Sequence, residues 1–121
     1  MSQAVLVKTC GMAGKALRGK WRIVEMDLWD TDAIDLLGPA FIEFNGRRGS
    51  FRFIAVDCSM DVRSPAKRTD YDAEFSFDGF DEGDSTTGRG WASLGEDGTL
   101  TGRIYFHMGD DSGFRAVPLN R

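Results

Sequence analysis

Two carboxylates and an indole at the end of the first patterned segment are the first candidates for a chemical site. Glu25, Asp27 and Trp29 alternate along the chain, and alternate residues of a β-strand point to the same side. Trp21 and Ile23 precede them on that side. If this side faces inward, the two carboxylates project into the interior, need partners there, and form a polar floor or mouth that orients a ligand. The alternative is that the strand twists and both acids reach solvent at the rim.

A second alternating set lies near the C-terminus, where Arg103, Tyr105 and His107 share one side of a predicted strand. Arg103 carries the guanidinium that would form a bidentate pair with an inward carboxylate. We therefore expect a concave apolar cavity near Trp29, Tyr105 and His107, with a few polar groups that orient its ligand. The candidate ligand-binding residues are Glu25, Asp27, Trp29, Arg103, Tyr105 and His107.

Metal-binding residue types also occur together, at His107, Asp110 and Asp111. A divalent metal usually takes three or four protein ligands in a fixed geometry, and an Asp-Asp pair before Ser-Gly is more typical of a turn. The acidic segment 81–88 lacks the ordered ligand spacing of a calcium loop, so it is predicted to be a solvated loop. No metal and no other cofactor is expected.

Nucleophilic catalysis by a Cys–His pair would require a cysteine and a histidine, and the chain has both. Cys58 lies in an apolar run, where burial raises the pKa of a thiol and makes it unreactive. With Cys10 as its only counterpart, it does not make a disulfide framework, and two reduced thiols in the cytoplasm are expected. No catalytic residue is assigned. A non-enzymatic role is favoured over an enzyme that uses the inward carboxylates or His107.

Strands must position nearly all of these residues. Alternating hydrophobicity and turn signals predict about seven strands, over 20–28, 41–44, 51–62, 71–77, 90–94, 100–108 and 114–117. A helix of one to two turns is predicted over 33–37, after a cap at Asp30 or Thr31 and before Gly38-Pro39. The prediction is an all-β fold, a small antiparallel meander barrel with one short helix after the first strand.

One turn signal predicts a hairpin, and one change in the apolar pattern favours a barrel over an open sheet. Asn45-Gly46 supplies the positive φ that a tight hairpin needs. Along 51–62 the apolar positions change from odd to even near Ile54-Ala55. A β-bulge or sharp coil within one long strand produces such a change, and strands bend in this way where a sheet curls round on itself.

Charge and length define the expected domain organisation. Residues 1–18 are predicted to be a flexible basic leader, and 19–121 a single β-barrel domain. After residue 20 the chain has 11 basic and 19 acidic residues. An acidic domain argues against nucleic-acid binding, which requires clustered positive charge. No segment approaches the roughly 20 apolar residues of a membrane-spanning helix, and no membrane association is expected.

The segment Gly19-Lys20-Trp21, followed by a short helix and a meander, resembles the start of the calycin group of lipocalin-like barrels. The resemblance implies an indole that closes one barrel end and an arginine, Arg115 or Arg103, that packs across it. The stretch from Trp21 to Asp30, and a later one from Gly102 to Ser112, also resemble a family of short uncharacterised bacterial proteins. That second likeness implies no activity.

The function that these features favour is small-ligand binding inside or at the mouth of a barrel, without catalysis. The alternative is an interaction module that pairs with another protein, or with itself as a homo-oligomer, through a strand edge or an exposed Trp patch. Trp29 and Trp91 are the candidates for such a patch.

Overall fold

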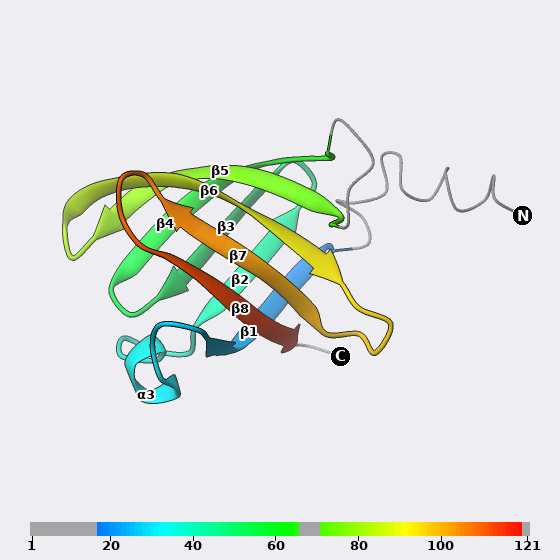
Figure 1. Cartoon of the computed structure of the whole chain (residues 1–121), viewed down its shortest axis with the longest axis horizontal. Helices are drawn as coiled ribbons and strands as arrows, with labels where there is room; N and C mark the ends of the chain where they lie inside the picture. The colour runs from blue at the N-terminus through cyan, green and yellow to red at the C-terminus, as the bar shows by residue number, and fades with distance from the viewer. Residues whose placement is uncertain (1–16, 66–70, 120–121) are drawn as a thin grey trace, which may run out of the picture.

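The protein is a closed barrel in which each antiparallel strand pairs with the next and the last pairs with the first (Figure 1). The computed structural model describes residues 17–65 and 71–119. The strands are β1 (Gly19–Met26), β2 (Phe41–Asn45), β3 (Arg48–Phe53), β4 (Val56–Arg63), β5 (Ala73–Asp81), β6 (Asp84–Leu94), β7 (Leu100–Phe106) and β8 (Asp111–Pro118). The predicted antiparallel meander barrel is confirmed, with eight strands.

The short helix after the first strand is also confirmed, as α3 (Thr31–Ile34). The Ala33 amide donates to the Asp30 carboxylate at 2.9 Å, which satisfies one of the amides that a helix start leaves without a partner. Ile34 is fully buried, so the helix packs on one end of the barrel. No helix within residues 17–65 and 71–119 is long and apolar enough to cross a membrane.

A bidentate ion pair fixes the chain that leaves α3. The Arg22 Nη1 and Nη2 atoms donate to the two Asp35 oxygens at 2.7 and 2.6 Å, and the Ala40 amide donates to Asp35 at 2.9 Å. The hydrogen bond from Arg22 lowers the pKa of Asp35 to about 2. Arg22 lies on β1, so this pair ties the α3 segment to the barrel wall.

The predicted long strand over 51–62 is wrong, because the chain turns back in its middle. β3 and β4 form a hairpin in which Phe53 pairs with Val56, and only Ile54 and Ala55 lie between them. Residues that flank a two-residue turn face the same side of a hairpin, which explains the change from odd to even apolar positions. Ile54 has a φ of 55°, unusual for a β-branched residue. Its amide donates to the Ile34 carbonyl at 2.9 Å, which anchors the turn against α3.

The predicted loop over 81–88 is also wrong, since β5 and β6 meet in a tight hairpin. Asp81 pairs with Asp84, and both residues between them, Glu82 and Gly83, have positive φ. A turn with two positive φ values matches the twist of the flanking strands and needs only two residues. β6 therefore begins at Asp84, six residues before the predicted strand.

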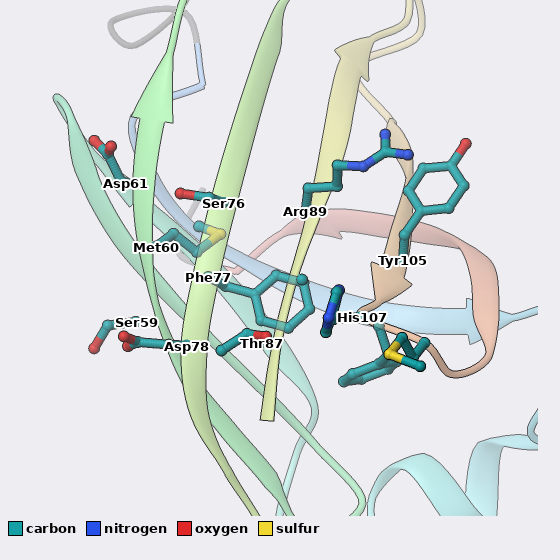
Figure 2. A pocket seen from close by; sticks show the side chains of 13 residues that line it. Ser59, Met60, Asp61, Ser76, Phe77, Asp78, Thr87, Arg89, Tyr105 and His107 are labelled. Atoms are coloured by element: carbon teal, nitrogen blue, oxygen red, sulfur yellow. The ribbon is translucent and has the colours of Figure 1, made fainter. Parts of the chain in front are cut away.

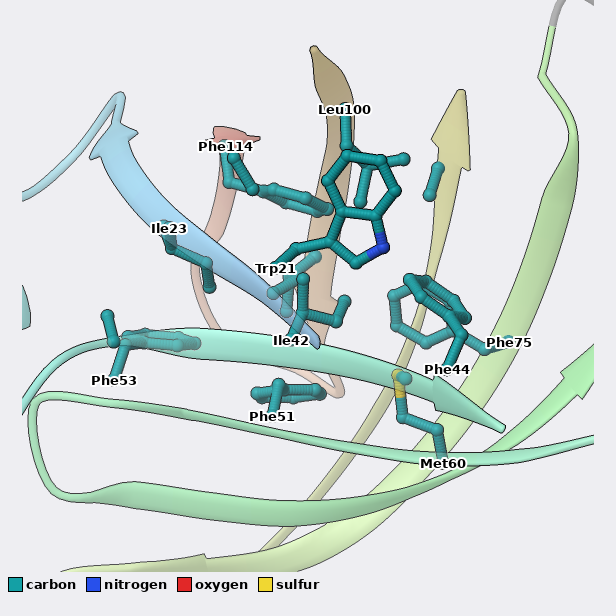
Figure 3. Packing of buried hydrophobic residues seen from close by; sticks show 14 of the residues in the cluster. Trp21, Ile23, Ile42, Phe44, Phe51, Phe53, Met60, Phe75, Leu100 and Phe114 are labelled. Carbon is teal, nitrogen blue, oxygen red and sulfur yellow. The ribbon is translucent and has the colours of Figure 1, made fainter. Parts of the chain in front are cut away.

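Side chains fill the barrel interior, and phenylalanine rings lie over inward-facing glycines of the neighbouring strand. The register pairs Phe75 with Gly90 and Phe77 with Gly88. A Cβ atom on Gly90 would lie 2.6 Å from the Phe75 ring. Phe51, fully buried, has its ring centroid 4.9 Å from that of Phe77. Figure 3 shows Phe51 and Phe75 among the buried side chains that fill the interior below the Trp21 indole.

Both ends of the barrel are covered by apolar side chains. At one end the Trp21 indole donates to the Leu17 carbonyl at 2.9 Å, and both residues are buried. At the α3 end Trp29 packs against Phe53, with ring centroids 5.5 Å apart. The strand predicted over 100–108 ends earlier, at Phe106. Met108 lies in the turn after β7 with a φ of 56° and is 94% exposed.

The predicted leader lies outside the described residues except for its last two. Leu17 is fully buried and Arg18 donates to Asn45 at 3.1 Å. Leu17 is thus part of the core, and the exposed Arg18 contacts β2 through its side chain.

Replacing Phe51 by alanine tests the central aromatic packing. Phe51→Ala should lower the free energy of unfolding by about 3–5 kcal/mol, because the large buried ring leaves a cavity. Phe80→Ala is the matched control, since Phe80 is 57% exposed; a loss of about 0.5 kcal/mol is expected there. Urea unfolding followed by tryptophan fluorescence measures both. Equal losses would contradict the packing.

Replacing Asp35 by asparagine tests the Arg22 pair. The pair holds the folded-state pKa of Asp35 at about 2, below its ordinary 3.8, so its stabilisation is complete above that ordinary value and lost as the pH falls through about 2. Asp35→Asn should destabilise the protein by about 1–2 kcal/mol at neutral pH, with a gap from wild type that narrows between pH 4 and 2. Unfolding curves at several pH values measure this. A constant gap, or the same effect from Asp57→Asn, would count against it.

Candidate functional site

A β-bulge decides where the first two candidate carboxylates point. The β1–β8 register passes from Ile23 opposite Ala116 to Glu25 opposite Arg115, so Val24 is an extra residue on β1. The bulge turns Met26 inward, where it is buried, and leaves Glu25 exposed. Glu25 and Asp27 are therefore on the outside of the barrel and do not form a polar floor within it.

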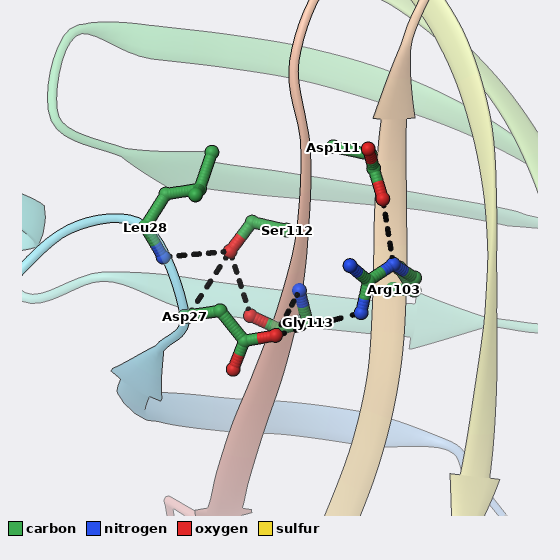
Figure 4. A network of polar contacts seen from close by, with 6 residues as sticks. All are labelled: Asp27, Leu28, Arg103, Asp111, Ser112 and Gly113. Carbon is green, nitrogen blue, oxygen red and sulfur yellow. Dashed lines mark hydrogen bonds and ion pairs between the residues drawn. The ribbon is translucent and has the colours of Figure 1, made fainter.

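Asp27 and Arg103 do meet, but on the outer surface (Figure 4). Arg103 Nε donates to Asp111 at 2.7 Å and its Nη1 donates to Asp27 at 3.4 Å. The hydrogen bond to Asp111 raises the pKa of Arg103. The buried Ser112 hydroxyl accepts hydrogen bonds from the amides of Asp27 and Leu28, at 3.1 and 3.3 Å, and donates one to the Gly113 carbonyl at 2.9 Å. This network joins β7, β8 and the end of β1, and its polar groups form hydrogen bonds and ion pairs with one another.

A groove of about 810 Å³ lies on the outer face of four consecutive strands, β4 to β7 (Figure 2). Its polar lining residues occupy the exposed positions of the strand alternation. They form two rows across the strands: Asp61, Ser76, Arg89 and Tyr105 in one, and Ser59, Asp78, Thr87 and His107 in the other. The groove is therefore built on paired backbone and not on a loop.

Charged and ring groups in this groove retain bonding capacity for a ligand. The Arg89 guanidinium lies 4.9 Å from the centroid of the Tyr105 ring. In the part of the chain that the structure describes, the side chains of Asp78, Arg89 and His107 make no hydrogen bond or ion pair. Asp61 differs, because it accepts from Arg63 at 3.1 Å. The groove thus offers a carboxylate, a guanidinium and an imidazole to a bound molecule.

A smaller recess of about 370 Å³ continues the groove along the same strands. It shares the whole row from Asp61 to Tyr105 with the larger groove. Tyr71 and Trp91 line it as a stacked pair, with ring centroids 5.2 Å apart and planes inclined by 21°. Trp91, one of the two predicted candidates for an exposed patch, therefore borders this recess.

The six predicted ligand-binding residues fall in three places. Tyr105 and His107 line the groove, Trp29 packs against the inner core, and the remaining three lie in outer ion pairs, since Glu25 accepts from Arg115 at 2.9 Å. Trp29 does not line the groove, so the cavity expected near Trp29, Tyr105 and His107 does not form.

Sequence reasoning missed Arg89 and Asp78. Thr87 and Arg89 alternate with glycines, and this alternation could have indicated a strand with these two side chains on one face. Glycine-rich segments, however, resemble loops.

The thiol and metal alternatives can be placed as well. Cys58 is a free, buried thiol on the inner face of β4, and burial, followed by the nearby charge of Asp57, raises its pKa to about 12. His107 is exposed on the outer face, so the two do not form a nucleophile–base pair. Among residues 17–65 and 71–119, no group of three or more His, Cys, Asp and Glu side chains is placed to hold a metal ion.

Comparison of the chain with protein-family models, curated proteins and solved structures finds no match. The likenesses to lipocalin-like barrels and to short bacterial proteins therefore stay predictions. Trp21 points into the barrel, whereas Arg103 and Arg115 lie on its outer face in ion pairs.

Replacing Ser112 by alanine tests the network around Asp27. Ser112→Ala leaves the Leu28 amide without its acceptor, whereas the Asp27 amide keeps the Gly113 carbonyl at 3.1 Å. The free energy of unfolding should fall by about 1–3 kcal/mol. The exposed Ser85 supplies the control, and Ser85→Ala should change little. Urea unfolding gives the energies, and amide hydrogen exchange should quicken most at residue 28. Unchanged exchange at the Leu28 amide would show that Ser112 does not hold it.

Proposed function

We propose that the protein is a non-enzymatic binding protein that holds a small ligand in the outer groove across β4 to β7. The observation that carries this proposal is the set of unpaired polar groups on Asp78, Arg89 and His107 within one groove. Its volume of about 810 Å³ falls in the range of ligand pockets, about 300–1,000 Å³.

A contrast with three other arginines on the outer surface supports this choice of site. Arg22, Arg103 and Arg115 each donate to a carboxylate of this chain. Arg89 instead rests on an aromatic ring and keeps its donors for another molecule. Because the lining residues stand on hydrogen-bonded strands, little conformational entropy is lost when a ligand binds.

The packed interior favours the outer groove over a binding site within the barrel. Rings of Phe51, Phe75 and Phe77 contact one another there, and both ends are covered. A ligand would have to displace buried side chains, at the cost of the packing that they contribute.

A fragment titration of the full chain tests the proposal. Amide chemical shifts of ¹⁵N-labelled protein would be followed against benzoate, tetramethylammonium and glycerol, and separately against short neutral oligosaccharides. We expect at least one probe to cause saturable shifts centred on residues 59–61, 76–78, 87–89 and 105–107. The double variant Arg89→Ala/His107→Ala should lose them, because it removes the two groups that project from the centre of the groove.

Arg115→Ala is the matched control, since it removes an exposed arginine elsewhere on the barrel. It should leave the shifts intact. The proposal fails if every probe leaves the groove unchanged, or if saturable shifts centre on the buried residues instead.

A second function, protein–protein interaction, is favoured by exposed leucines beside α3. Leu28, Leu36 and Leu37 are 50%, 62% and 63% exposed. Patches of exposed apolar side chains mark docking sites for other proteins. Native mass spectrometry of the full chain would report a dimer or larger assembly if this face serves self-association. A purely monomeric spectrum would leave the groove as the site to pursue.

A further inference from the structure

We infer that the ligand of the groove is an uncharged oligosaccharide lying across the outer face of β4 to β7. This inference rests on the proposed function and specifies the chemical class of its ligand. Four properties of the site carry it: its extent, its mixture of donors and acceptors, its aromatic wall and its charges of both signs.

The extent favours a chain-like ligand over a compact one. The larger groove and the smaller recess share the row Asp61, Ser76, Arg89 and Tyr105, so they form one continuous depression along the strands. His107 lines the larger groove and Trp91 the recess, so the two lie on opposite sides of the shared row. A ligand with repeated small units can occupy both parts without entering the barrel.

The bonding groups match hydroxyls, which both donate and accept. Ser59, Ser76 and Thr87 supply hydroxyls of their own. Asp78 only accepts, Arg89 only donates, and the two ring nitrogens of His107 add further hydrogen-bonding positions. Each sugar hydroxyl finds a partner of either kind within this set, whereas an apolar ligand would leave these groups unpaired on binding.

The aromatic wall matches the apolar face of a sugar ring. Trp91 borders the recess and is held in place by its stack on Tyr71. Flat rings offer large apolar area with few rotatable bonds, and the C–H groups on one side of a pyranose form a similarly flat apolar face. The Arg89–Tyr105 pair continues this wall toward the larger groove.

The charges of the site favour a neutral ligand over a compact anion. Asp61 is paired with Arg63, and the remaining acids, Asp78 and Glu74, outnumber the remaining base, Arg89, by one. A compact anion would bring its charge near the two acids, and a compact cation near Arg89. An uncharged polyol gains hydrogen bonds from all three without either repulsion.

Titration with neutral oligosaccharides tests the inference. Maltotetraose, cellotetraose and chitotetraose would be added separately to ¹⁵N-labelled full-length protein, with quenching of tryptophan fluorescence as a second readout. We expect saturable binding of at least one, with shifts in both the groove and the recess. Asp78→Ala and Trp91→Ala should each raise its dissociation constant about tenfold, as loss of one good contact does.

Two controls keep the outcome readable. Asp57→Ala removes an exposed acid of β4 outside the groove and should bind as wild type does. Asp78 is exposed, so its alanine variant keeps the test valid even if Trp91→Ala unfolds. Groove shifts with benzoate or tetramethylammonium and none with any of the three oligosaccharides would overturn the inference while the proposed function stands. Absence of groove shifts with every probe would overturn both.

Discussion

A phenylalanine ring lying over a glycine of the next strand is the contact on which the rest of this barrel depends. Phe75 covers Gly90 and Phe114 covers Gly102, each in direct register. A Cβ on either glycine would lie 2.6 Å from the ring opposite. Because the glycines yield this space, large rings fit inside a small barrel and fill it. The interior therefore contributes packing, and the polar groups that could contact a ligand lie on the outer face.

The outer surface divides into two kinds of polar cluster as a result. Around Asp27, Arg103 and Ser112 the charges and hydroxyls bond to one another and join the strands that close the barrel. Over β4 to β7, Asp78 and Arg89 have no such partners in the described chain. The first cluster links the strands that close the barrel, and the second is the surface that we propose binds a ligand.

Much of the fold could be predicted from the residues. Alternation located most strands, Asp30 marked the helix start, and Asn45-Gly46 marked a hairpin. The predicted end of the helix before Gly38-Pro39 was wrong, since α3 ends at Ile34. The turn at Ile54-Ala55 could not be predicted, because neither residue is a usual turn former and the surrounding structure imposes the positive φ of Ile54. The first half of β6 was missed because its glycines are typical of loops. Their place in a strand is explained only by the phenylalanine rings that cover them.

Prediction of the site was limited by register. A one-residue bulge at Val24 moved Glu25 and Asp27 to the other face from Trp21 and Ile23, and such a shift exchanges the inner and outer sides of a strand. Tyr105 and His107 were identified by their residue types, but the groove that contains them is assembled from four strands. Only the pairing of those strands brings Arg89 and Asp78 beside them.

Methyl NMR under xenon pressure tests the central claim, that the barrel interior is filled, most directly. Xenon enters apolar cavities, and the methyl groups of Ile23, Ile42 and Ile104 report on this interior because all three are fully buried. A filled barrel predicts only small, linear shifts of these methyl signals as the pressure rises. Saturable shifts at these three residues would reveal an accessible cavity and contradict the account.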